Sequence, residues 1–426
     1  MSISNKTLCI AYLILVGITV ALPMRALADA YHYTNILVGD RAAGLAGAYT
    51  AISDDPTGLY YNPAGIVYAV GSNLSGSMNA LHVSQTNYKN ALGNQTWMRT
   101  SIALLPNFFG MIQPFGGGTL GFSYAIPDST LENQQQKFNL PNSLLGNNTD
   151  LTINFNNQDV VYNIGPSFAV KFTEKFSLGL TLYGVVHQQR LIFNQEFKAA
   201  SGYHWVNSYA NFEEYGLRPI VGMMWSPIEK LSFGAAFSQP KMVYTRNTVQ
   251  LSCARNNTAT YPDNSVCKNG LLLLNNSIDN QRYIKPWSVE LGAAYFYSTA
   301  LLLTTTLSAY ENLYRSTAQI SPELPLVNVA GGFEYYFLGN YAMRAGLYTN
   351  LANSPEIFLG KTGQGEHVNL YGMTFSLSNF TRSSAITGGL GISTGQGKAQ
   401  VVEDTTDIQD VSVYIFSLFL SASYSY

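Results

Sequence analysis

The last sixteen residues, VSVYIFSLFLSASYSY at positions 411–426, alternate between large apolar and small polar side chains. A period of two belongs to a β-strand whose faces meet different surroundings. A soluble domain seldom ends on a strand with aromatic residues at its tip. The stretch therefore favours a strand with one face in lipid. That face would carry Tyr414, Phe416, Leu418, Leu420, Ala422, Tyr424 and Tyr426.

The same alternation recurs along most of the chain, as in residues 120–126, 176–183 and 231–238. Short polar turns precede these strands, whereas segments such as 127–157 and 251–279 read as long, Asn-rich loops. Short turns at one end and long loops at the other are typical of an outer-membrane barrel. We therefore predict an all-β fold, a 14-stranded antiparallel transmembrane β-barrel. We expect its strands near 66–86, 97–114, 118–126, 158–172, 176–194, 212–226, 231–249, 281–297, 300–314, 325–337, 341–351, 368–380, 384–394 and 409–426.

A soluble β-sandwich or β-helix also alternates, and the composition bears on this choice. Charged residues make up 11% of the chain, aromatic residues 13%, and the net charge is -2. This charge gives no basic field for nucleic acid. An aromatic-rich, charge-poor chain fits contact with outer-membrane lipid and lipopolysaccharide.

The chain begins with a signal-peptide pattern over residues 1–28. Lys6 precedes an apolar run, and small residues at Ala26 and Ala28 predict cleavage after Ala28 or Ala30. No later stretch approaches the roughly 20 apolar residues of a membrane helix. Secretion without a helical anchor agrees with the barrel.

Residues 31–65 do not alternate and predict short helices instead. Asp40 can cap a small-residue helix, and Asp54 or Asp55 can cap a second turn. Asn62 precedes a proline and is pushed out of helical geometry. We expect a compact piece, small enough to lie in the bore of the barrel.

This piece resembles the N-terminal hatch of the FadL family of outer-membrane transporters for long-chain fatty acids. The matching residues are Gly44, Gly47, Ala48, Asp54, Asp55, Tyr61, Asn62, Pro63, Ala64 and Gly65. Looser matches follow at 114–127, 165–180, 226–240 and 331–348. The resemblance implies a hatch over 29–65 and a barrel over 66–426. The hatch or gating role would fall to Asp54, Asp55, Asn62, Pro63, Ala64 and Gly65.

In that family, cargo captured outside leaves sideways through a gap at a kink in the third strand. The matching place here is the end of the third predicted strand, at Ala125 and Pro127. Proline lacks the backbone donor of a ladder. Pro127 is also consistent with the plain start of a loop.

Alternation sets five charges on the inner face: Lys171, Arg218, Glu290, Glu334 and Arg344. A lipid-facing Arg or Lys would cost about 2–4 kcal/mol at the midplane. Arg218 or Arg344 could meet an anionic head group. Alternatively, the charges pair with one another and with the acids of the hatch.

The predicted loop 127–157 contains four apolar residues in a polar run. Phe138, Leu140, Leu144 and Leu145 are candidates for a greasy capture groove, or for a local loop core.

Cys253 and Cys267 lie in the predicted loop 251–279, in an oxidising compartment, and we expect a disulfide. The five histidines show no ligand spacing, so no metal site is predicted. Neither catalytic residues nor a cofactor are expected.

The resemblance implies passive uptake of long-chain fatty acids or other hydrophobic small molecules, with capture by outer loops, gating by the hatch and lateral exit near strand three. The aromatic C-terminus resembles the signal read by the barrel assembly machinery. An alternative is a barrel that binds protein partners, either an adhesin or a relative of the PorV-like proteins of secretion systems, which carry a similar hatch.

Overall fold

The computed structural model describes residues 31–92, 94–143, 146–200, 202–257, 273–279, 285–311, 326–401 and 406–426. The predicted signal peptide, residues 1–28, lies outside them. Among the described residues, none of the helices has the length and apolar character needed to cross a membrane.

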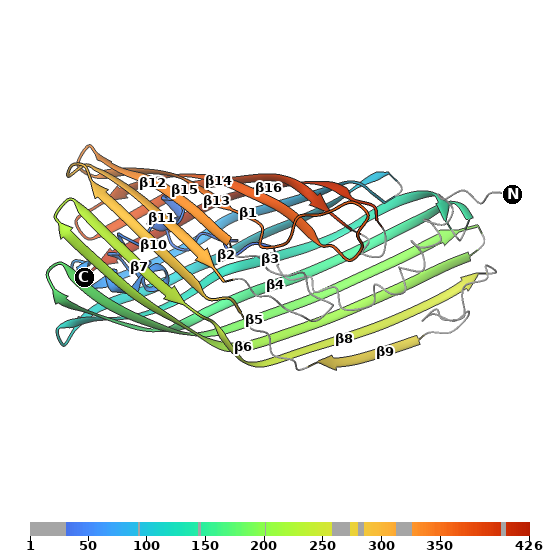
Figure 1. The fold of residues 1–426 in the computed structure, drawn as a ribbon, viewed down its shortest axis with the longest axis horizontal. Helices are drawn as coiled ribbons and strands as arrows, with labels where there is room; N and C mark the ends of the chain where they lie inside the picture. The colour runs from blue at the N-terminus through green and yellow to red at the C-terminus, as the bar shows by residue number, and fades with distance from the viewer. Residues whose placement is uncertain are drawn as a thin grey trace.

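An antiparallel sheet closes on itself through the pairs β1–β16 and β5–β6 (Figure 1). Fourteen strand positions complete the ring, as the sequence predicts, because the seventh position is divided into β7 and β8 and the eighth into β9 and β10. The strands are β1 (Asn73–Leu92), β2 (Gln95–Phe115), β3 (Gly118–Ser143), β4 (Gly146–Thr173), β5 (Phe176–Ala199), β6 (Gly202–Ile228), β7 (Leu231–Ser238), β8 (Lys241–Asn257), β9 (Leu273–Asp279), β10 (Ser288–Phe296), β11 (Leu301–Tyr310), β12 (Leu326–Phe337), β13 (Tyr341–Asn350), β14 (Glu366–Phe380), β15 (Ser384–Ala399) and β16 (Gln409–Ser425).

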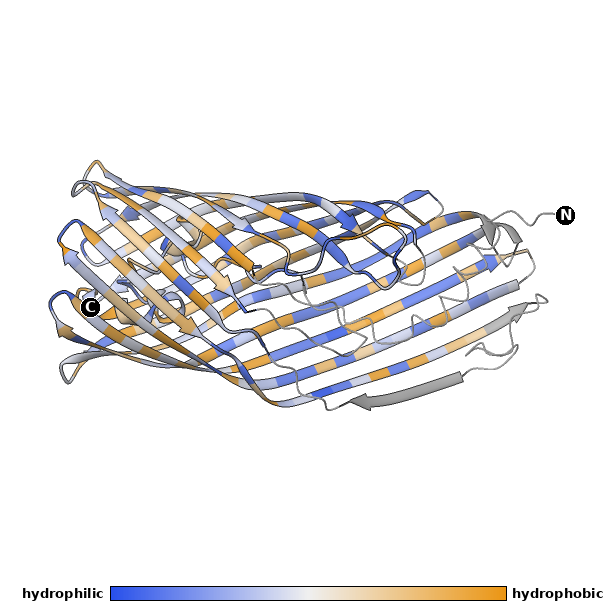
Figure 2. Ribbon diagram, viewed as in Figure 1, coloured by the Kyte–Doolittle hydropathy of each residue, from blue (hydrophilic) through white to orange (hydrophobic). Residues whose placement is uncertain are grey.

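The outer face of the barrel carries an apolar band, visible as alternating colours along the strands in Figure 2. On β16, Tyr414, Leu418 and Tyr424 are all exposed, whereas Ser421 between them is buried. Ten residues separate the two tyrosines, which matches the roughly 9–11 residues of a tilted transmembrane strand. This is the surface of an outer-membrane barrel.

β3 to β6 and β8 extend far beyond the ends of β10 to β13 (Figure 1). The prediction of a loop over 127–157 is therefore wrong, because most of it belongs to β3 and β4. Beyond the bilayer the outer face meets water, so outward positions need not be apolar there. In this part of the strands the apolar side chains point inward instead: Leu151, Ile153 and Phe155 are buried on the inner face.

Residues 31–72, here called the N-terminal segment, lie inside the barrel; their helices lie toward the end where the C-terminus lies (Figure 1), whereas His32 bonds to Val368 near the opposite end of β14. The segment contains α2 (Arg41–Gly44), α3 (Gly58–Tyr61) and the 3₁₀ helix η1 (Pro63–Tyr68). Because η1 continues to Tyr68, β1 begins at Asn73 rather than near residue 66.

Candidate functional site

The helices of the N-terminal segment begin and end where their capping residues stand. The Asp40 carboxylate accepts the Arg41 N–H at the start of α2. Asn62 is extended after α3, and its side-chain oxygen accepts the Ala64 N–H at the start of η1. The Asp40 cap and the extended conformation of Asn62 agree with the sequence prediction. The N-cap of α3, however, is Thr57 rather than Asp54 or Asp55, and it has no side-chain cap bond.

The inner wall holds the segment through hydroxyl groups that donate to its backbone carbonyls. Four such bonds of 2.8–3.0 Å come from three strands, two from β5 and one each from β11 and β14: Ser177 to Ala64, Thr181 to Leu59, Thr304 to Ala48 and Thr374 to Gly44. The buried carbonyls of an irregular segment need such partners. The bore is thus matched to this segment.

Asn62 ties the segment to β6. Its side-chain nitrogen donates to the Met223 carbonyl (3.0 Å) and to the Thr50 carbonyl within the segment (2.7 Å). Pro63, Ala64 and Gly65 are buried beside it. The Asn-Pro-Ala-Gly motif therefore contacts the wall directly.

A buried chain of charges joins the segment to β12 and β13. Arg41 bonds to Asp54 and to Glu334 (2.7 Å), and Glu334 also accepts from Arg344 (2.6 Å). This arrangement favours pairing of the inward charges over binding of a head group by Arg344. The Glu334 carboxylate binds Arg344 of the wall and Arg41 of the segment, and so anchors the segment.

Asp55 lies near this chain and accepts the Thr57 N–H (2.7 Å). Burial, together with Asp40, raises the pKa of Asp55 to about 6, although Arg41 opposes the shift. A folded-state pKa above the ordinary value means that protonation stabilises the folded form, and that this contribution is lost as the pH rises from about 4 through 6.

We predict that the N-terminal segment becomes easier to cleave by protease as the pH rises from 4 to 7, and that Asp55→Asn removes the pH dependence. The amide is neutral throughout and keeps an oxygen for Thr57. Proteolysis of the folded barrel with a protease active over this range measures the effect. Equal pH dependence in both proteins would contradict it.

The ladder between β2 and β3 is interrupted. Ser101 pairs with Glu132 and Phe108 with Ala125 in one register, but residues 102–107 form no ladder pair with 126–131. The interruption spans seven residue steps, roughly 23 Å. The β3–β4 register also shifts after Ala125.

The N-terminal segment crosses this interruption from inside. The Ile36 N–H donates to the Pro127 carbonyl on β3 (3.1 Å), and the Leu37 carbonyl accepts from the Asn107 side chain on β2 (3.1 Å). Pro127 therefore lies within a long strand, at its distortion, and does not start a loop.

A cavity of about 330 Å³ lies between the N-terminal segment and the wall. Its lining combines tyrosines and aliphatic side chains with many polar and charged ones; it includes Tyr33, Ile36, Leu37, Tyr60, Tyr61, Pro127, Asp128, Val161, Asn163, Val185, His187, Arg218, Met242, Lys285, Glu290 and Tyr310. A concave site that sets polar groups beside apolar and aromatic side chains is typical of ligand binding.

Arg218 is the sequence-predicted cation that faces this cavity. Its guanidinium donates to two neutral hydroxyls, Ser238 (3.0 Å) and Tyr60 (3.4 Å), and lies 5.0 Å from the Tyr60 ring centre. Asn163 on β4 is 1% exposed, and neither polar atom of its side chain has a partner in the described structure. The cavity thus offers a cation and an unsatisfied amide to a polar group.

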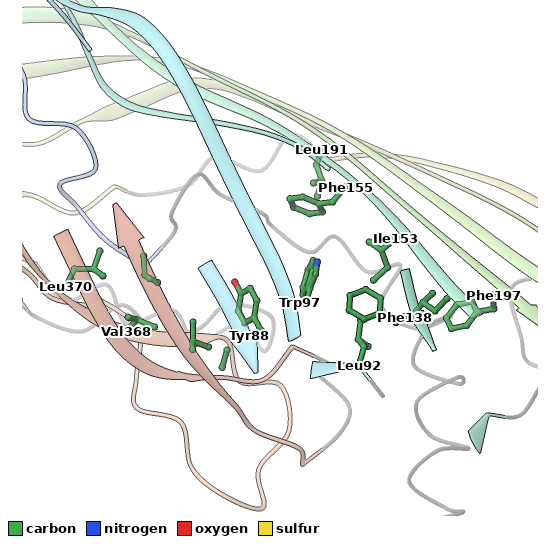
Figure 3. Packing of buried hydrophobic residues seen from close by; sticks show 14 residues of the cluster. Tyr88, Leu92, Trp97, Phe138, Ile153, Phe155, Leu191, Phe197, Val368 and Leu370 are labelled. Atoms are coloured by element: carbon green, nitrogen blue, oxygen red, sulfur yellow. The ribbon is translucent and has the colours of Figure 1, made fainter. Parts of the chain in front are cut away.

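A second apolar region lies on the inner face of the long strands (Figure 3). Phe138 belongs to this cluster with Trp97 and Phe155, and Leu140 packs against it. These residues lie on the inner face of β3, so the predicted loop groove is corrected to a strand surface. Leu144 and Leu145 lie outside the described residues.

Cys253 is buried within β8 and disulfide-bonded. Its predicted partner, Cys267, lies outside the described residues. The predicted loop 251–279 is shortened by β8 and β9.

Sequence reasoning missed the contributions of Tyr60, Asn107 and Asn163. A tyrosine or asparagine in a tyrosine- and asparagine-rich barrel carries no signal of its own, because only the closed wall sets it beside its partners.

No family model matches the chain, and no curated protein matches its sequence. Solved structures do match. The toluene transporter TodX of Pseudomonas putida shares 14% identity at a TM-score of 0.61, over 93% of this chain and 99% of that one. A Pseudomonas aeruginosa FadL homologue shares 13% identity (TM-score 0.61, 92% and 99%), and the Ralstonia pickettii toluene transporter TbuX shares 12% (TM-score 0.61, 92% and 99%).

The closed barrel and its outward apolar band are those of a multi-pass protein of the Gram-negative outer membrane, and the solved structures share this fold. The chain therefore has the fold of the FadL-like outer-membrane channels.

Proposed function

We propose that this barrel is a passive channel for hydrophobic small molecules, with the cavity beside the N-terminal segment as its binding site. The observation that supports this proposal is the cavity: tyrosines and aliphatic side chains line it together with polar and charged groups, and the interrupted β2–β3 ladder borders it at Pro127. TodX and TbuX, which share the fold, are toluene transporters.

The cargo we propose for this site has an apolar body and an anionic end, as a long-chain fatty acid does. Arg218 supplies a cation whose described hydrogen bonds go to neutral hydroxyls, whereas Arg344 is held by Glu334. The observations favour Arg218 over Arg344 as the residue that meets a carboxylate.

Arg218→Gln is predicted to weaken binding of a long-chain fatty acid by about ten- to a hundredfold, because hydrogen bonds to charged groups contribute about 1.5–3 kcal/mol. Binding of toluene should change by less than about twofold, since a neutral ring gains no charge-assisted bond. Calorimetry or fluorescence displacement in detergent measures both, with Arg190→Gln, an exposed cation on β5, as control. Equal losses for both ligands would contradict the assignment.

Within this proposal the N-terminal segment acts as the hatch, and cargo leaves sideways through the β2–β3 interruption. The bonds of Ile36 and Leu37 across that gap support a role for the segment in closing it.

Bridging the gap from outside should block exit. We predict that Leu104→Cys with Leu131→Cys, both exposed, lowers uptake at least ~tenfold once a bifunctional maleimide joins them, while ligand binding in detergent persists. Met111→Cys with Phe122→Cys, a pair within the continuous ladder, is the matched control. Full uptake through the bridged protein would remove the lateral route.

Mass spectrometry of organic extracts from the purified folded protein tests the function as a whole. A stoichiometric hydrophobic compound, lost in Arg218→Gln, supports the channel. Extracts with only detergent and bulk phospholipid, together with co-purified proteins, would favour the partner-binding barrel.

A further inference from the structure

The barrel wall has a second break, where β7 gives way to β8 and β10 begins. Ser238 pairs with Ser288, and Asn247 pairs with Asp279. Continued by two residues beyond the Ser238–Ser288 pair, the β7–β10 register places Pro240 opposite Pro286, and neither of them forms a ladder pair. Neither proline has an N–H, so the two strands cannot exchange backbone hydrogen bonds at that position. Proline in a sheet is ordinarily confined to edges, strand starts and bulges.

The cavity of the proposed binding site reaches this break. Pro240, Met242, Lys285 and Pro286 all line it. β7 ends at Ser238 and β8 begins at Lys241; β6 pairs with both in one register, and between them only Gln239 and Pro240 form no ladder pair with it. The two prolines therefore stand between the cavity and the outside of the wall.

Two aromatic pairs indicate where the break lies along the membrane normal. Phe237 and Trp287 lie next to it with ring centres 6.4 Å apart, and Tyr215 and Tyr244 lie beyond it with centres 5.7 Å apart. Tyr244 is 45% exposed. Tyr and Trp gather at the bilayer–water interfaces of barrels. The break therefore lies at the outer interface of the membrane.

Charged groups line the inner side of the break. The Lys285 ammonium lies 3.0 Å from Glu214, and His187 bridges Glu214 (3.2 Å) and Asp159 (2.9 Å). A molecule that passes here meets apolar side chains and a polar cluster together. This suits an amphiphile better than a pure hydrocarbon.

We propose that the Pro240–Pro286 break is a side port that admits amphiphilic molecules from the outer leaflet into the cavity. The port supplies the proposed channel from the membrane, in addition to any route from water, and in this sense it rests on the proposed function. The opposed prolines keep the wall from closing as a continuous ladder.

Photo-crosslinking tests the port without any cargo. A benzophenone amino acid replaces Met242, which lines the cavity at the break, in protein reconstituted in phosphatidylethanolamine–phosphatidylglycerol vesicles. The matched inward control is Val185, which lines the same cavity behind paired strands, and the outward control is Val243, 53% exposed. We expect the Met242 probe to form lipid adducts near the Val243 level and ~tenfold above Val185, because lipid reaches only surfaces open to the bilayer. Adducts at the Val185 level would overturn the port.

Restoring the donors gives an independent test. Pro240→Val with Pro286→Val should lower lipid adducts at Met242 toward the Val185 level, whereas Pro166→Val on β4 should leave them unchanged. Undiminished adducts in a folded double variant would show that the prolines do not hold the port open. Ligand binding to the cavity is measured separately, so failure of the port and failure of the channel are distinguishable.

Discussion

Valine at both Gly179 and Gly222 is expected to raise the ionic conductance of the reconstituted barrel at least ~tenfold, because a fourteen-stranded bore without its filling is wide enough for water. A Cβ at Gly179 would lie 2.4 Å from the Pro63 carbonyl carbon, and one at Gly222 would lie 2.1 Å from the Asn62 side-chain oxygen. At such distances the added atoms would overlap the segment, so the segment must shift away from the wall. The segment would leave the wall at its Asn-Pro-Ala-Gly motif.

Conductance across planar lipid bilayers measures the opening. Gly184→Val on the same strand is the matched control, since its Cβ would meet no atom closer than 3.6 Å. A folded double variant with the same ionic conductance as the parent would mean that these contacts do not hold the N-terminal segment in the bore. Altered conductance in the control would show that any valine on this strand disturbs the wall.

The sequence predicts the barrel well where lipid and bore impose different chemistry on alternate residues. β16 follows this rule from Tyr414 to Tyr424. The rule fails above the membrane, where residues 127–157 read as a polar loop although Leu151, Ile153 and Phe155 alternate within it. The outward partners there are polar because they meet water, and three inward apolar residues among asparagines are a weak signal.

The candidate site is less predictable, because several of its residues, Arg218 among them, acquire their roles through partners far away in the chain. Alternation assigns Arg218 and Arg344 to the inner face without distinguishing them. The register of the β12–β13 hairpin sets Glu334 directly opposite Arg344, whereas the fold brings Tyr60 of the N-terminal segment against Arg218, and these neighbours decide which arginine is available to a ligand. The hairpin register around the turn at 338–340 could have predicted the carboxylate beside Arg344, but no local pattern predicts Tyr60 beside Arg218.

Glu334→Gln is expected to destabilise the folded barrel by about 3–5 kcal/mol, because breaking a buried ion pair leaves uncompensated charge. Glu334 is fully buried and accepts from Arg41 of the N-terminal segment and from Arg344 of β13. The amide removes the negative charge that both guanidinium groups share. Arg41 keeps its ion pair with Asp54 inside the N-terminal segment but loses its ion pair with the wall. The segment should therefore loosen before the barrel unfolds.

Urea unfolding in micelles gives the free energy, and proteolysis of the folded protein reports release of the segment. Glu174→Gln is the control, since this side chain is 93% exposed and lies 3.7 Å from Lys171, and such surface pairs contribute about 0–1 kcal/mol. Adding Arg344→Gln to Glu334→Gln should cost less than the two single changes together, because it removes one of the stranded charges. Strict additivity would mean that the two side chains do not act as a pair, and that the anchor of the segment lies elsewhere in the wall.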